Sequence, residues 1–209
     1  MRRPPTLKTI EIFASPQGEG LRQGEPTIFV RLAGCNLRCA FCDTKRAWRA
    51  GREMPVGKIA EEVGRLRRDY PTTWVCLTGG EPLAQDVRPL IQRLHDAGCR
   101  VQVETNGTFP PAPLADWHTV SPKPPDYDVH PGFRKSAREV KLVVCRALDL
   151  DGVRTVRAAF PPVVPLILQP QSNALWSMNR AVGLLEAASR AGLEGVRLSV
   201  QLHKIYGFR

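Results

Sequence analysis

Short apolar runs recur along the chain, separated by segments with helical periodicity. The runs are rich in β-branched residues, and several are apolar enough to be buried on both faces of a sheet. We expect eight strands, at residues 9–13, 27–33, 73–78, 101–105, 118–121, 139–144, 163–169 and 195–200. Strands that alternate with helices in this way are typical of βα units around a parallel sheet, either open or closed towards a barrel.

Three of the intervening segments carry apolar residues three and four positions apart, which predicts one buried face on each helix. These faces are Ile59, Val63 and Leu66; Val87, Leu90, Ile91 and Leu94; and Leu175, Met178, Val182 and Leu185. Asp86 is the expected N-cap of the second helix. The Pro-rich segment 121–136 is expected to be a loop over the sheet edge, so residues 1–209 are predicted to form a single domain.

Polar motifs follow five of the expected strands. They read GCNLRC, GGEP, NGT, SPKP and QPQSN, in chain order. In parallel α/β folds, ligands bind at the carboxyl ends of the strands. The sequence therefore predicts a functional site built from these five loops.

Composition narrows the class of protein. The chain has 209 residues, 43% of them hydrophobic, and no run of the ~20 apolar residues that a membrane span needs. We expect a cytoplasmic protein without membrane association, in which the six cysteines stay reduced and Cys76, Cys99 and Cys145 are small buried side chains. The net charge of +10 comes from scattered arginines without an aromatic stripe, which indicates a solvated positive surface and no direct nucleic-acid binding; attraction of small anionic substrates is the functional alternative.

Cys35, Cys39 and Cys42 lie within eight residues and have no fourth cysteine nearby. Three thiolates can hold three irons of a 4Fe-4S cluster and leave the fourth iron open for catalysis. A zinc site completed by His130 or His203 and a redox pair of Cys39 with Cys42 are alternatives, but neither explains the C-x3-C-x2-C spacing. Ferredoxin-like electron transfer would need a fourth cysteine at its own spacing.

At these residues the chain resembles the radical S-adenosylmethionine (SAM) superfamily, whose motif is matched by Cys35, Cys39, Phe41 and Cys42. The resemblance implies an α/β fold, a single-domain partial TIM-like barrel of parallel strands and helices. It also implies that SAM binds the open iron and is cleaved to a 5'-deoxyadenosyl radical. TGGEP at 78–82 resembles the second motif of the superfamily, although a plain tight turn would also explain its glycines.

A narrower resemblance covers nearly the whole chain. EIFASPQGEG (11–20), FVRLAGCNLRCAFCDT (29–44), LTGGEP, ETNGT, SPKP and QLHK together resemble the 7-carboxy-7-deazaguanine synthase family. This implies a carbon–nitrogen lyase that converts 6-carboxy-5,6,7,8-tetrahydropterin to 7-carboxy-7-deazaguanine with loss of ammonia, in 7-deazapurine and queuosine biosynthesis. It also implies Mg2+, a flavodoxin-like or similar reductant, and a homodimer.

The family's site residues carry over by motif. The resemblance assigns substrate binding to Pro16, Gln17, Gly18, Glu19, Arg31, Thr78 and His203. It assigns the cluster to Cys35, Cys39 and Cys42, and Mg2+ to Thr44. It assigns SAM binding to Phe41, Gly80, Glu81, Ser121, Pro122, Lys123, Gln169, Pro170, Gln171, Ser172 and Asn173.

Charge logic supports two of these roles, and each assignment has a structural alternative. The Glu19 carboxylate can accept two adjacent N–H donors of the pterin, and the Arg31 guanidinium can pair with the substrate carboxylate. Purely structural alternatives are a glycine turn at 17–20, an ion pair at Arg31, a turn hydroxyl at Thr44 and a surface position for His203. Loop capping is the alternative for residues 121–123 and 169–173.

Two other classes of protein share part of the pattern. An activating enzyme for a glycyl-radical protein would have the cysteine triad, but those enzymes usually follow the third cysteine with Asn-Pro, where this chain has Asp43 and Thr44. A non-enzymatic metal-binding module for nucleic acid is the second class. A colourless zinc protein, as opposed to a brown iron–sulfur protein, would favour it.

Overall fold

The computed structural model describes residues 4–49 and 51–209, whose contacts divide them into two compact units. The first unit comprises the residues up to Gln17, with 25–105 and 112–117. The second unit comprises 18–24, 106–111 and 118–209. The expectation of one domain over residues 1–209 stays a prediction.

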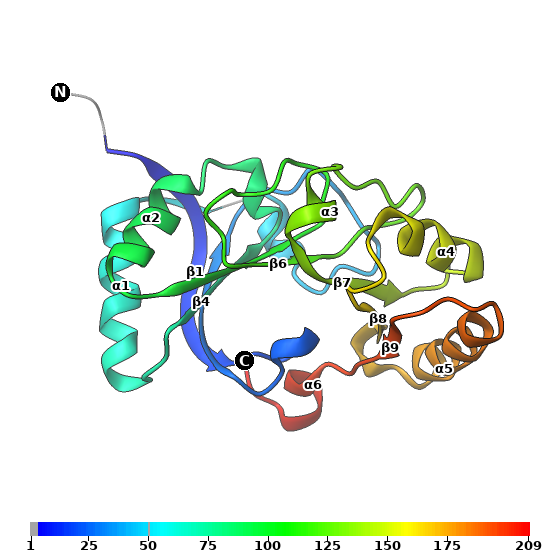
Figure 1. Ribbon diagram of the computed structural model, residues 1–209. Coiled ribbons are helices and arrows are strands. Elements are labelled where there is room, and N and C mark those ends of the chain that lie inside the picture. Colours follow the sequence, from blue (N-terminus) through cyan, green and yellow to red (C-terminus); the bar gives the residue numbers. More distant parts are fainter. Residues whose placement is uncertain (1–3, 50) are drawn as a thin grey trace. The chain divides into compact units, whose positions relative to one another are not determined.

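The first unit contains five strands in the order β3-β1-β2-β4-β5, of which β1 and β4 are labelled in Figure 1. They are β1 (Thr6–Pro16), β2 (Pro26–Leu32), β3 (Arg52–Pro55), β4 (Trp74–Gly79) and β5 (Arg100–Thr105). β1 runs antiparallel to both β2 and β3, whereas β2, β4 and β5 are parallel. In the β2–β4 register Leu32 is paired with Gly79, so the loops that follow these two strands begin side by side.

The core of the first unit lies under two helices, α1 (Val56–Asp69) and α2 (Arg88–Asp96). Their expected apolar faces are confirmed, because they pack on the sheet in one cluster with Ile28, Val30 and Val75. Asp86 was predicted as the N-cap of α2, but the N-cap is Val87. Asp86 lies one residue earlier and still accepts a hydrogen bond from the Arg88 N–H at 3.2 Å.

The second unit contains four strands in the order β6-β7-β8-β9, all parallel to their neighbours. They are β6 (Trp117–Val120), β7 (Ala137–Val144), β8 (Leu166–Pro170) and β9 (Val196–Leu198). Its helices are α3 (Phe133–Ser136), α4 (Leu150–Ala159), α5 (Leu175–Arg190) and α6 (Leu202–Tyr206). Short 3-10 turns are η1 (Gly20–Arg22) and η4 (Gln171–Asn173) here, and η2 (Lys45–Trp48) and η3 (Pro82–Ala84) in the first unit.

The apolar face predicted for α5 is wrong. Leu175, Met178 and Val182 are 72%, 38% and 45% exposed. The buried face is instead made of smaller residues, namely Ser177, Ala181, Leu184 and Ala188. Small side chains let a helix approach a sheet closely, so this face packs on the unit and the larger apolar face stays outside.

All eight expected strands are present, and β3 is an addition that sequence patterning missed because its four residues are mostly exposed. Within the described residues, β3 pairs only with β1 and β9 only with β8, so the strand order does not close. The α/β class with a mostly parallel sheet is confirmed. In the described part of the chain, every helix is too short or too polar to cross a bilayer.

Candidate active site

The cysteine loop follows β2 in the first unit. Cys35, Cys39 and Cys42 are half-buried and form no disulfide, and the Leu37 N–H donates a hydrogen bond to Cys35 Sγ at 3.4 Å. Burial raises the pKa of the Cys35 thiol, the bond from Leu37 opposes this, and the charge of Glu81 adds to the rise. Three accessible, unbridged thiols on one loop fit three ligands of an iron–sulfur cluster, which binds them as thiolates.

At Gly79 and Gly80 the backbone of the second motif contacts the backbone at the start of the cysteine loop. The Gly80 N–H donates to the Leu32 carbonyl at 3.0 Å, and the Glu81 N–H donates to the Gly34 carbonyl at 2.7 Å. A Cβ on Gly80 would lie 2.0 Å from the Gly34 carbonyl oxygen, and one on Gly79 would lie 2.1 Å from that of Leu32. Glycine is therefore required here for close contact between two backbones, beyond what a plain turn demands.

Glu81 is fully buried, and its carboxylate has a structural task. Its Oε1 accepts hydrogen bonds from Thr105 Oγ1 at 2.8 Å and from the Leu83 N–H at 3.0 Å. The N–H groups of Gly80 and Glu81 already donate to backbone carbonyls. A cofactor amine is itself a donor, so the groups of this motif suited to it are the backbone carbonyls.

Arg31 lies on β2, directly opposite Glu11 on β1. Arg31 Nε donates to Glu11 Oε1 at 2.9 Å, and Arg46 forms a second ion pair with the same oxygen. The structural ion pair considered for Arg31 is thus present. It uses Nε, so the terminal NH2 groups are the part of the guanidinium suited to a substrate carboxylate.

Thr78 and Gln17 meet at a carboxylate that sequence reasoning did not select. Thr78 Oγ1 donates to Glu104 Oε2 at 2.9 Å, and Gln17 Nε2 donates to Glu104 Oε1 at 3.1 Å. Thr78 and Gln17 are buried, whereas Glu104 is half-buried at the end of β5. The first unit therefore joins two of the expected substrate residues through Glu104.

The remaining expected residues of the first unit lie on β1 and the cysteine loop. Pro16 is the last residue of β1, and Phe41 is half-buried between Cys39 and Cys42. Thr44 occupies the N-cap position of η2 without capping it, and its hydroxyl instead donates to Asp43 Oδ1 at 2.9 Å. Mg2+ binds hydroxyl and carboxylate oxygens, and Thr44 and Asp43 offer one of each side by side.

In the second unit Glu19 is held by three donors. Its carboxylate is ion-paired with Lys141 of β7 and accepts from Gln201 Nε2 at 2.6 Å, and the Gln169 side chain of β8 donates to it as well. Burial alone would raise the pKa of Glu19, but the Lys141 charge and these hydrogen bonds lower it to about 2. Glu19 is therefore a fixed anion at neutral pH.

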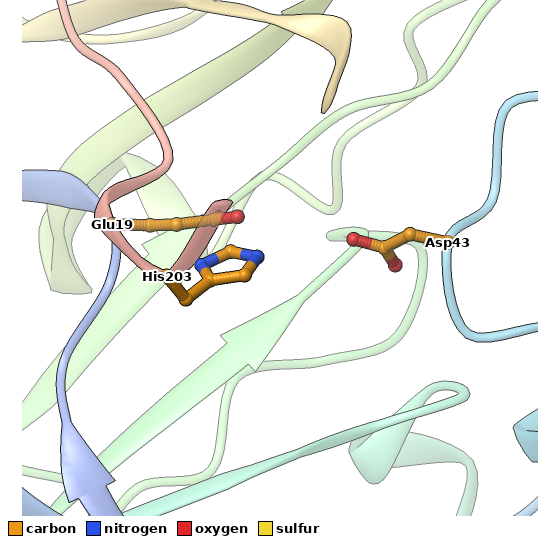
Figure 2. A group of neighbouring side chains, drawn as sticks. All are labelled: Glu19, Asp43 and His203. Atoms are coloured by element: carbon orange, nitrogen blue, oxygen red, sulfur yellow. The ribbon is translucent and has the colours of Figure 1, made fainter. Parts of the chain in front are cut away.

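His203 lies beside Glu19 in the same unit (Figure 2). One of its ring nitrogens is within 4.8 Å of a Glu19 carboxylate oxygen. Gly18 is packed against this ring, because a Cβ on Gly18 would lie 2.5 Å from His203 Nδ1. The second unit thus brings together Gly18, Glu19 and His203. Asp43, also labelled in Figure 2, belongs to the cysteine loop of the first unit.

The loops after β6 and β8 contain the other expected cofactor residues. Ser121 Oγ donates to the Lys141 carbonyl at 2.7 Å and accepts from Lys123 Nζ at 2.5 Å, while Pro122 is buried between them. Asn173 exchanges two hydrogen bonds with the backbone of Gln201, at 2.8 and 2.9 Å. Loop capping thus accounts for Ser121 and Asn173 in the absence of a ligand.

The rest of the loop after β8 has the geometry of a tight turn. Pro170 ends β8, and the Gln171 N–H donates to Ser177 Oγ at 2.7 Å. Ser172 and Asn173 are both left-handed, with φ of 53° and 52°. Two consecutive left-handed residues other than glycine are uncommon, which marks this turn as a constrained segment.

Sequence reasoning missed four residues of these networks: Glu11, Glu104, Lys141 and Gln201. Three of them stand inside or beside motifs that the sequence had singled out, in EIFASPQGEG, ETNGT and QLHK. Lys141 has no such signal, because a lysine within an apolar strand does not reveal its partner.

A family model described as the radical SAM superfamily matches residues 29–121. A 7-carboxy-7-deazaguanine synthase of Synechocystis sp. is 33% identical over 95% of this chain and 92% of its own length. One of Hyperthermus butylicus is 45% identical, over 63% of this chain and 60% of its own length.

Among solved structures, QueE from Escherichia coli matches with a TM-score of 0.78 and 29% identity, covering 95% of each chain. The match confirms the fold class and the radical SAM core, whose members carry a 4Fe-4S cluster and bind SAM. The cysteine loop, the glycine pair fastened to it and these relatives agree, and the chain belongs to the 7-carboxy-7-deazaguanine synthase family of the radical SAM superfamily.

Proposed function

We propose that this protein converts 6-carboxy-5,6,7,8-tetrahydropterin to 7-carboxy-7-deazaguanine with loss of ammonia, in 7-deazapurine and queuosine biosynthesis. The observation that carries the proposal is the cysteine loop with three half-buried cysteines outside any disulfide, whose base is hydrogen-bonded to the Gly80–Glu81 backbone. The relatives that match over most of the chain are named 7-carboxy-7-deazaguanine synthase, which supports this activity.

Cys35, Cys39 and Cys42 would hold a 4Fe-4S cluster, which together with SAM would supply the radical chemistry for hydrogen abstraction at C6 of the pterin. The protein's own residues bind and orient. Arg31 receives the substrate carboxylate through its terminal NH2 groups, since Glu11 engages Nε. Glu19 accepts from the N–H edge of the pterin, and its low pKa supports this role because an ionised carboxylate only accepts.

The other expected substrate contacts belong to the same proposal. Thr78 and Gln17 orient Glu104 through their hydrogen bonds, and His203 contributes a ring nitrogen beside Glu19. Ser121, Lys123 and the turn at 171–173 contact SAM, which they can do by exchanging hydrogen bonds that they make within the protein for bonds to the cofactor. Thr44 binds Mg2+, with the Asp43 carboxylate beside its hydroxyl as support.

Four wider proposals accompany the activity. A one-electron reductant of the flavodoxin type donates to the cluster, and the net charge of +10 supports docking of an acidic partner. The protein acts as a cytoplasmic homodimer, and the exposed apolar face of α5 supports association. Residues 1–209 act as one domain, since relatives match across both units.

Anaerobic reconstitution with iron and sulfide, followed by incubation with the carboxytetrahydropterin, SAM and a reductant, tests the activity. We expect a brown protein that forms 7-carboxy-7-deazaguanine and ammonia in equal amounts. A brown protein that cleaves SAM but leaves the pterin intact would reject the substrate. A colourless protein after reconstitution would reject the radical chemistry as well.

A further inference from the structure

Lys141 is a lysine of β7 whose side chain is only 8% exposed, and it forms an ion pair with Glu19, whose side chain is 15% exposed. Burying both charges is costly, and such a pair is poor evidence for a gain in stability. The position of Lys141 suggests a role at Glu19, since its ammonium group bonds to the Glu19 carboxylate.

The donors that meet Glu19 come from three separate segments. Lys141 is on β7, Gln169 on β8, and Gln201 immediately precedes α6. Lys141 bonds to Oε2 and Gln201 to Oε1, so both carboxylate oxygens are held. Donors on both oxygens fix the plane of the carboxylate and so determine the direction in which its remaining acceptor capacity points.

The backbone of the Glu19 loop is held by other contacts. Glu139, two residues before Lys141 on the same face of β7, accepts from the Leu21 N–H and from Thr119 Oγ1, both at 2.6 Å. The Leu202 N–H donates to the Gly18 carbonyl at 2.9 Å. Loss of the Lys141 side chain should therefore act on the Glu19 carboxylate and leave the loop in place.

We propose that Lys141 is a positioning residue for the substrate, which acts through Glu19 by keeping its carboxylate ionised and aimed at the N–H donors of the pterin. The proposal rests on the proposed function, in which Glu19 binds this edge. Within the second unit, the charged or titratable groups that face Glu19 are Lys141 and His203. Gln169 and Gln201 add neutral donors.

The decisive variant is Lys141→Met, which keeps the length of the side chain and removes its charge. In the wild type Glu19 is ionised at every assay pH, because its pKa is about 2. Without Lys141 the effect of burial is less opposed, so the pKa of Glu19 rises towards the assay range. We expect KM for the pterin to rise roughly 10- to 100-fold at pH 7, and kcat/KM to fall further as the pH is lowered from 9 to 6.

Iron content, SAM affinity and the thermal unfolding midpoint of the reconstituted enzyme are measured on the same samples. Lys135→Met is the matched control, since Lys135 is exposed on α3 of the same unit. It should keep the wild-type KM and pH profile. Lys141→Arg keeps the charge, so its kcat/KM should not fall at low pH more than that of the wild type. Its KM should rise less than the KM of Lys141→Met.

A wild-type KM and pH profile in Lys141→Met would overturn the proposal. If that variant does not load iron, Gln201→Met tests the same carboxylate by removing one neutral donor, and a KM within twofold of the wild type would overturn the proposal equally. The proposed function fails in a different way, namely when the wild type itself does not consume the pterin.

Discussion

Glu11 and Arg31 face each other across the antiparallel pair of β1 and β2, and the carboxylate accepts from Arg31 Nε at 2.9 Å. The same carboxylate oxygen also pairs with Arg46, whose side chain is 60% exposed. Glu11 thus fixes the Nε edge of the Arg31 guanidinium, whose Cζ lies 5.8 Å from the centroid of the Phe13 ring. This arrangement is a structural ion pair, and it leaves the terminal NH2 groups for the anion binding proposed for Arg31.

Arg31→Ala should lower kcat/KM for the carboxytetrahydropterin by ~10- to 200-fold, because a charge-assisted bond to the substrate carboxylate is lost. Uncoupled 5'-deoxyadenosine formation should persist. Arg46→Ala is the control, since it removes the exposed partner of the same Glu11 and should change kcat/KM less than threefold. If Arg31→Ala discriminates carboxylated from carboxylate-free pterins as the wild type does, Arg31 is structural only.

Alanine at Cys35, Cys39 or Cys42 should abolish cluster binding and turnover, because each thiolate holds one iron. Cys76→Ala and Cys99→Ala should retain both, since these thiols are buried in the core of the first unit. Iron and sulfide analysis after reconstitution decides the matter. Four irons per chain in Cys42→Ala would count against the assignment.

Gly80→Ala should separate the second motif from the cysteine loop. The new Cβ would lie 2.0 Å from the Gly34 carbonyl oxygen and 2.8 Å from that of Ala47, so the backbone must move. We expect the free energy of unfolding to fall by about 1–3 kcal/mol and iron loading to drop.

Gly183→Ala on α5 is the matched control for Gly80→Ala, because its Cβ would meet nothing within 4 Å. It should stabilise the protein by about 0.5–1 kcal/mol. Chemical denaturation measures both variants. Equal iron content and equal stability in the two would show that the contact between the loops tolerates a methyl group.

Thr44→Ala should weaken the response of turnover to Mg2+ without loss of the cluster or of SAM cleavage. The hydroxyl lies against Asp43 and does not cap η2, so its removal should leave the turn intact. A magnesium titration of turnover measures the effect. An unchanged titration would mean that the ion, if bound, takes its ligands elsewhere.

The sequence predicted the strands and the cysteine loop because both depend on local patterns. The prediction for the buried face of α5 was wrong, because this helix packs through the small residues Ser177, Ala181 and Ala188 and not through its larger apolar side chains. The roles expected for Glu19 and Arg31 come from the family resemblance and are supported by charge, but their partners Lys141 and Glu11 depend on which strands pair and in what register. No periodicity in a single sequence encodes that pairing.

The partners of Glu19 also determine when its carboxylate can be anchored during synthesis. Lys141 and Gln201 stand 122 and 182 residues further along the chain, so both leave the ribosome long after residues 18–24. The first unit gathers residues up to 117 and can begin to fold while the rest is being made. The Glu19 carboxylate therefore gains both of these donors only after translation has passed Gln201, whereas the first unit does not depend on either of them.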